Sequence, residues 1–305
     1  MTDFLQVLWN MMPSTFLIAS PILIAAIGGM ICERAGVVNI ALEGLMVLGA
    51  MTAAVTSVLL GGGSGFSAFV ALLLAAIVGG LFSLFHAFAS VTLRADQVVS
   101  GAGINLLSLG LTVFVCQLLF NQDRSPPHGG GMRAGLFGFF PTVWIALALL
   151  AVAWFVLYRR PWGLRLRAAG EHPEALASAG VNVARIRYVA VILSGLLAGL
   201  AGGAAVLTQD IQFTATTING TGFIALAAVS FGRWLPLGIL GSSFLFGMAT
   251  ALAINFVNIR ALREFFPSEF FSAMPFLITL ITLIIFSGKD YAPRAIGKPF
   301  DKGKS

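Results

Sequence analysis

Charged residues are scarce in this sequence of 305 residues, because Asp, Glu, Lys and Arg together make up only 10% of it. Water-soluble globular domains carry about 25% charged residues and are less than half apolar. Here 58% of the residues are hydrophobic and the mean hydropathy is +0.95. The composition therefore excludes a water-soluble globule and predicts an integral membrane protein.

Several chemical features are also missing. The two cysteines, Cys32 and Cys116, lie in or beside apolar runs, which excludes a disulfide scaffold and indicates inert buried thiols. No second His or Cys stands at ligand spacing, so we predict no metal. The glycine cluster at residues 61–65 lacks the Lys of a phosphate-binding loop, and no nucleophile and base stand at workable spacing. We therefore predict neither an enzyme nor a bound cofactor.

Apolar runs long enough to cross a bilayer dominate the sequence instead. A membrane core of about 30 Å needs about 20 residues of helix. Eight such runs are present, at residues 12–32, 37–60, 67–91, 98–120, 141–158, 188–207, 235–257 and 271–287. A ninth, at residues 223–231, is too short to cross alone, so it either borrows from residues 211–218 or forms a broken helix shielded by protein. We expect an all-α polytopic membrane helix bundle of about eight to ten segments, forming a single transmembrane domain over residues 1–305.

The placement of Lys and Arg predicts the orientation, since basic loops stay in the cytoplasm. With nine crossings and the N-terminus outside, every basic residue lies inside except Arg124, Arg133, Arg260 and Arg263. The net charge of +6 therefore reflects membrane orientation, and we expect no nucleic-acid partner. The cytoplasmic parts are then a loop at residues 159–187 and a basic tail at residues 288–305. The missing basic start also argues against a cleaved signal peptide.

Residues 33–44, at the start of the second span, are the most informative stretch of the chain. They read Glu-Arg-Ala-Gly-Val-Val-Asn-Ile-Ala-Leu-Glu-Gly. Asn39 and Glu43 are four residues apart and share one helical face, and Glu43 lies near mid-membrane, about 13 Å beyond Arg34. A carboxylate there costs about 2.5–3.5 kcal/mol, so it must face a partner or water. Glu43 either hydrogen-bonds an adjacent helix end and holds the bundle together, or lines the solute path.

The fourth span carries a stripe of small and polar residues on one helical face. The stripe consists of Gly101, Asn105, Ser108, Thr112 and Cys116. It can line a hydrated pathway, or it can be the packing seam that small residues and hydrogen bonds create between membrane helices. The candidate pathway residues are therefore Asn39, Glu43, Asn105, Ser108 and Thr112. We expect the pathway between the second span, the fourth span and the short segment near Phe223.

Two other patterns have structural interpretations. Gly195, Gly199 and Gly203 repeat at steps of four in the sixth span, which predicts a close helix-packing face. His86 lies in the third span without a second histidine near it, and we interpret it as a hydrogen-bonded core residue.

The cytoplasmic loop contains a predicted short helix. Residues 170–180 read Gly-Glu-His-Pro-Glu-Ala-Leu-Ala-Ser-Ala-Gly, with Pro173 in the first turn and Gly180 as the stop. A helix of about two turns is barely stable alone in water, so we expect it to dock. Glu171 and Glu174 would be repelled by anionic lipid headgroups, which favours a protein partner over a position on the lipid surface.

The stretch at residues 33–44 resembles the signature of inner-membrane permease subunits of bacterial ABC importers in the branched-chain amino acid, ribose and nucleoside group. Within that group the chain looks most similar to the nucleoside permeases that work with a basic-membrane-protein-type lipoprotein. The resemblance spans nearly the whole chain and includes residues 170–175, 194–199, 232–238 and 295–299. It implies a transport subunit of the bacterial cytoplasmic (inner) membrane.

The resemblance also implies partners. Glu174, Ala175 and Gly180 are similar to the Glu-Ala-Ala-x-x-x-Gly motif of the coupling helix that such permeases present to a separate ATPase, although Leu176 departs from it. The residues assigned to ATPase coupling are Arg167, Gly170, Glu171, Pro173, Glu174, Ala175, Gly180 and Asn182. ATP would be bound by that ATPase, a second and different permease would complete the channel, and an external lipoprotein would deliver nucleosides.

Two alternatives remain. The cargo of the same kind of importer could be a simple sugar such as ribose. The chain could instead be a stand-alone secondary transporter in which Glu43, Asp210 and His86 relay protons.

Overall fold

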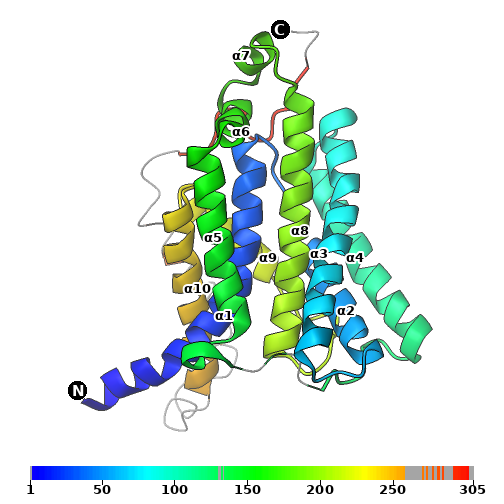
Figure 1. Ribbon diagram of the computed structural model, residues 1–305, viewed down its shortest axis with the longest axis vertical. Coiled ribbons are helices and arrows are strands. Elements are labelled where there is room, and N and C mark those ends of the chain that lie inside the picture. The colour runs from blue at the N-terminus through cyan, green and yellow to red at the C-terminus, as the bar shows by residue number, and fades with distance from the viewer. Residues whose placement is uncertain are drawn as a thin grey trace.

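The described part of the chain is an all-α bundle. The computed structural model describes residues 2–129, 132, 134–257 and 291–301, together with positions 270, 273, 277, 280, 281 and 284. Over these residues there is no strand, and the long helices run side by side with α6 (Pro161–Glu171) and α7 (Pro173–Ser178) gathered at one end (Figure 1). We call this the α6 end. The expectation of an all-α polytopic bundle is confirmed.

Seven helices of the described residues are long and apolar enough to cross a membrane. They are α1 (Thr2–Arg34), α2 (Leu42–Leu59), α3 (Gly65–Ala87) with the π-helical turn Phe88–Thr92, α4 (Gln97–Phe120), α5 (Pro141–Arg159), α8 (Val183–Gln209) and α10 (Pro236–Val257). α1, α2 and α8 are largely buried, whereas α4 lies at the edge of the bundle and diverges from it (Figure 1). Its exposed leucines suit contact with lipid.

These helices correspond to seven of the eight predicted runs, and the eighth, at residues 271–287, falls largely outside the described residues. Three boundaries differ most from expectation. The first run was predicted from residue 12, but α1 begins at Thr2, ten residues earlier. The second run was predicted from residue 37, but residues 37–41 are not helical, because Gly36 turns the chain with a φ of +89° and Val38 N donates to Gln97 Oε1 at 2.7 Å. The sixth helix begins five residues earlier than predicted, since Asn182 caps it by accepting from Arg185 N at 3.0 Å.

The ninth segment is a broken crossing. Residues 210–220 are not helical, and α9 (Thr221–Phe231) has 11 residues, or about 17 Å of helix. The segment starts where α8 ends, at the end of the bundle away from α6. Past α9, Trp234 O accepts from Arg34 Nη2 at 3.0 Å at the α6 end. The chain therefore traverses the bundle half unwound, which is the broken-helix form of the two expected.

Glycines set the close approach of α8 to α2 and α3. A Cβ atom on Gly202 would lie 1.9 Å from Met46 O, and one on Gly49 would lie 2.1 Å from Gly199 O. A Cβ on Gly195 would lie 2.3 Å from Ser83 Oγ. The predicted glycine face of the sixth span is therefore a packing face, in which backbones touch without intervening side chains.

We expect Gly202→Leu to destabilise the protein by about 3 kcal/mol or more, since the side chain would collide with the backbone of α2. Thermal unfolding of the purified protein and its abundance in membranes measure this. Gly110→Leu on α4 is the matched control, because a Cβ there meets no atom within 4 Å. Equal stability of the two variants would contradict the packing argument.

Candidate functional site

Glu43 holds the broken end of the half-helix α9. Its Oε1 accepts from Gly220 N and its Oε2 from Gly222 N, both at 2.7 Å. A Cβ on Gly222 would lie 2.5 Å from Glu43 Cα, so glycine is needed for this approach. The carboxylate also lies at the positive end of the α9 dipole. These contacts are those of the first alternative for Glu43, in which it bonds an adjacent helix end.

Asn39 and Asn105 bond to protein groups around the start of α2. Asn39 Nδ2 donates to Ser194 Oγ at 2.9 Å, and the residue is fully buried. Asn105 Oδ1 accepts from Gly44 N at 2.8 Å, while its Nδ2 donates to Ile40 O at 3.0 Å. The Asn105 amide thus binds backbone groups that the non-helical turn before α2 leaves without helical partners.

The stripe on α4 faces α2. Ser108 Oγ donates to Ile104 O at 2.7 Å and Thr112 Oγ1 donates to Ser108 O at 2.8 Å, so both hydroxyls bond within their own helix. A Cβ on Gly44 would lie 2.8 Å from Ser108 Oγ. The contacts of these residues are those of a packing seam. None of the five candidate pathway residues lines the cavity considered next, which is one of several cavities of about 400–500 Å³ in the described structure.

That cavity has a volume of about 400 Å³ and lies between α1, α8, α10 and residues 216–221. The volume falls within the range of about 300–1,000 Å³ typical of small-molecule sites. Its polar lining consists of Gln209, Thr216, Thr217, Asn219, Thr221 and Thr250, and its apolar lining of Ile18, Ile22, Ala205, Ile218, Ile224, Ala253 and Ile254. Among the described residues that line the cavity, none has an ionisable side chain.

The cavity differs from the expected pathway in its elements. We expected a path bounded by the second span, the fourth span and the short segment near Phe223. Of these three elements, only the short segment contributes residues to the cavity lining. The sequence did not predict the polar residues at 216–221 as cavity lining, because they lie in an unwound segment without helical periodicity. The available signal was the density of Thr and Asn immediately before a span too short to cross.

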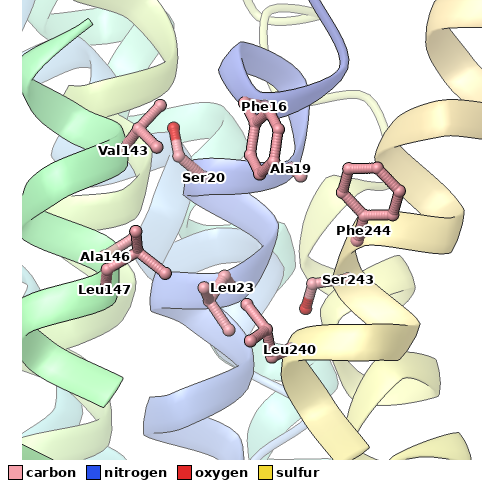
Figure 2. A pocket seen from close by; sticks show the side chains of 10 residues that line it. All are labelled: Phe16, Ala19, Ser20, Leu23, Val143, Ala146, Leu147, Leu240, Ser243 and Phe244. Carbon is pink, nitrogen blue, oxygen red and sulfur yellow. The ribbon is translucent and has the colours of Figure 1, made fainter. Parts of the chain in front are cut away.

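A smaller pocket lies between α1, α5 and α10 (Figure 2). Figure 2 shows it lined mostly by apolar side chains, with Ser20 and Ser243 as the hydroxyl groups. Ser20 Oγ donates to Thr142 Oγ1 at 3.2 Å. The volume of about 20 Å³ is room for about one water molecule, so this pocket is too small for a solute.

A loop at the end opposite α6 fixes the chain that leads to the cavity. Ser125 N donates to Phe213 O at 3.1 Å and Ser125 Oγ accepts from Phe213 N at 2.9 Å. His128 N donates to Ile211 O at 2.9 Å, and its Nε2 donates to Val206 O at 3.2 Å. Burial lowers the pKa of His128, which favours its neutral form. This loop therefore anchors residues 211–213 just ahead of the cavity lining.

At the α6 end the predicted short helix is present as α7. Pro173 is its first residue, and Gly180 follows it with a φ of +78°, a conformation that favours glycine. Glu174 and Ala175 are exposed, whereas Leu176 is buried. Leu176, which departs from the motif, thus packs inward and leaves the exposed face of α7 unchanged.

The other residues assigned to coupling have inward roles as well. A Cβ on Gly170 would lie 2.3 Å from Arg34 O, so α6 presses directly on the end of α1. The Arg167 guanidinium stacks 4.8 Å from the Tyr158 ring. Asn182 is the cap of α8, and Glu171 Oε2 receives a long hydrogen bond of 3.5 Å from Arg294 N.

The tail crosses the α6 end, an arrangement that the sequence did not predict. Ala295 N donates to Gly170 O at 2.8 Å and Gly297 N donates to Gly36 O at 3.2 Å. Arg187 binds the carbonyls of Ala35 and Lys298 at 3.2 and 2.9 Å, and Arg94 pairs with Asp301 at 2.6 Å. The tail therefore connects α6, α8 and the turns that precede α2 and α4.

A continuous set of contacts joins α6 to the cavity. α6 touches the end of α1 at Arg34, and Arg34 binds Trp234 O just beyond α9. Trp234 Nε1 also donates to Glu33 Oε2 at 2.5 Å. The far end of α9 is held by Glu43 beside the cavity lining. A displacement of α6 can therefore be passed to α9 through these contacts.

The family model described as branched-chain amino acid transport system / permease component matches residues 11–283. The chain belongs to this family. It is therefore a multi-pass membrane protein and a permease component of a transport system, and it is not itself an enzyme. In the described ranges no three His, Cys, Asp or Glu side chains gather as metal ligands.

Individual relatives match over most of their length. The guanosine ABC transporter permease protein NupQ of Bacillus subtilis is 41% identical over 99% of both chains. The nucleoside ABC transporter permease protein NupC of Lactococcus lactis is 38% identical over 94% of this chain and 95% of that protein. The putative glucose ABC transporter permease protein TsgC13 of Haloferax volcanii is 34% identical over 81% and 77%.

We expect Glu43→Ala to destabilise the protein by about 1–3 kcal/mol for each of the two amides left without a partner. Glu43→Gln keeps an acceptor oxygen and should cost less. Thermal unfolding in detergent, together with membrane abundance, measures both. Glu174→Ala removes an exposed carboxylate and should stay within about 0.5 kcal/mol of the wild type. A Glu43→Ala protein as stable as this control would show that the contact does not hold α9.

Proposed function

We propose that the chain is the membrane-spanning permease subunit of an ATP-driven importer that carries nucleosides. The observation that carries this proposal is the match to NupQ and NupC over nearly the whole chain at 41% and 38% identity. The polar, uncharged side chains among the described cavity residues support it, since a nucleoside is neutral and rich in hydrogen-bonding groups.

The local electrostatics favour a neutral cargo over an amino acid. Transporters commonly bind a substrate carboxylate at the N-terminus of a broken helix. In this chain the Gly220 and Gly222 amides at that position already bind Glu43, and none of the described residues that line the cavity is a cation. A simple sugar is the second candidate, supported by the similarity to TsgC13. The apolar isoleucine side of the cavity favours a nucleobase, which has apolar faces.

We propose that different partners bind at the two ends of the bundle. A separate ATPase docks on the exposed face of α7, and ATP binds to that ATPase while this chain holds no cofactor. Closure of the ATPase moves α6, and the contacts at Arg34 and Trp234 pass the movement to α9. At the opposite end an external binding lipoprotein delivers the solute, and a second, different permease completes the channel.

The proposed orientation in the bacterial cytoplasmic membrane places the α6 end inside. In this proposal the N-terminus is outside, since α1 begins at the end opposite α6, and the C-terminal tail is inside, since residues 291–301 lie at the α6 end (Figure 1). A proton relay is less well supported, since His86 binds Ser100 and Val38 O while Glu43 binds α9.

Changes at the exposed face of α7 test this proposal. In cells with the complete transporter, we expect Glu174→Lys and Gly180→Val to reduce nucleoside uptake at least about tenfold at normal membrane abundance, because they alter the ATPase contact. The measurement is uptake of labelled uridine, guanosine and ribose. Arg185→Ala, an exposed change beside α7, is the control. Undiminished uptake would refute the docking assignment, and uptake of ribose alone would make the cargo a sugar.

A further inference from the structure

The cavity contains two amide side chains with hydrogen-bonding capacity to spare. Asn219 makes no side-chain hydrogen bond to any described residue, and its side chain is exposed. Gln209 has one long contact, from its Nε2 to Leu17 O at 3.4 Å, which leaves its Oε1 unused in the described structure. An amide group offers a donor and an acceptor side by side.

The neighbouring hydroxyls are already engaged. Thr221 Oγ1 donates to Ile218 O at 2.5 Å and Thr250 Oγ1 donates to Phe246 O at 3.0 Å. Thr217 Oγ1 accepts from Thr214 N at 3.0 Å. Thr221 and Thr250 have thus used their hydroxyl protons, and Thr216 and Thr217 each contact Thr214 Oγ1, at 3.2 and 3.3 Å. The two amides differ from these hydroxyls because each carries separate donor and acceptor groups.

The position of Asn219 is fixed by the architecture around it. It precedes Gly220, whose amide is bound by Glu43, and its own φ is +41°. Asparagine tolerates this left-handed region better than most residues other than glycine. Its side chain is therefore held at the cavity by a rigid backbone, which is the preorganisation that a selective site needs.

We propose that Asn219 and Gln209 bind the hydrogen-bonding edge of the nucleobase as the solute passes through the cavity. The proposal rests on the nucleoside cargo inferred above. Paired amide donors and acceptors match the donor and acceptor pattern of base edges, as Asn and Gln do when they read adenine. Ile18, Ile22 and Ile224 supply an apolar surface for the ring faces. The described lining residues carry no charge, which suits an uncharged nucleoside.

Uptake by cells carrying the complete transporter tests the assignment. Asn219→Gly removes the amide and suits the positive φ, so it should fold normally, and Gln209→Ala removes the second amide. Gln117→Ala, an exposed amide on α4, is the matched control. Because the binding protein selects the solute first, we expect the maximal rate to fall about tenfold. The fall should differ between guanosine and uridine, whose base edges differ.

A purely structural effect would instead lower uptake of both nucleosides by the same factor, and that result would overturn the proposal. Rates equal to those of Gln117→Ala would overturn it too, while leaving the nucleoside importer intact. If the wild-type transporter takes up no nucleoside, both the proposed function and the base-edge assignment are refuted.

Thiol labelling gives a second, independent measurement. Thr250→Cys and Gln209→Cys should react with a membrane-impermeant thiol reagent added from outside, and guanosine supplied with the binding protein should slow the reaction. The native cysteines, Cys32 and Cys116, are buried and serve as the wild-type background. Failure of either variant to react, or reaction that guanosine does not slow, would place the solute outside this cavity.

Discussion

The bonding of Glu43 to the start of α9 is the interaction on which the candidate site depends. In a bilayer core a broken helix leaves backbone amides without water, and each needs a partner from the protein. Glu43 supplies two acceptor oxygens at 2.7 Å, and Gly222 allows the backbones to approach. The loop with Ser125 and His128 fixes one end of the unwound segment, and Glu43 fixes the other end, beside α9.

Most polar residues inside the bundle act in the same architectural way. Asn105 and Gln97 bind backbone groups around the turn before α2, and Arg187 binds the carbonyls of Ala35 and Lys298. Asn219, in the unwound segment, and Gln209, at the end of α8, instead line the cavity with amide groups that have unused hydrogen-bonding capacity. The residues that hold the helices are thus distinct from the residues that we propose to contact cargo.

This separation explains what the sequence could and could not predict. The spans and the short helix α7 were predictable because bilayer thickness sets the length of apolar runs and because Pro173 and Gly180 mark helix ends. The cavity lining was not predictable, since an asparagine in an apolar run, such as Asn39 or Asn105, gives the same local pattern whether its partner is a protein group or a solute. Only the tertiary contacts, such as Asn39 to Ser194 across 155 residues of sequence, reveal the partner.

The unwound segment also bears on how such a permease changes its cargo during evolution. Substitutions within the long helices alter packing, as the contact of Gly202 with Met46 illustrates. Residues 214–219 take part in no helix, so their side chains can be exchanged without disturbing helical hydrogen bonds. Diversification of substrates among related permeases can therefore proceed through a handful of positions while the scaffold in the lipid stays the same.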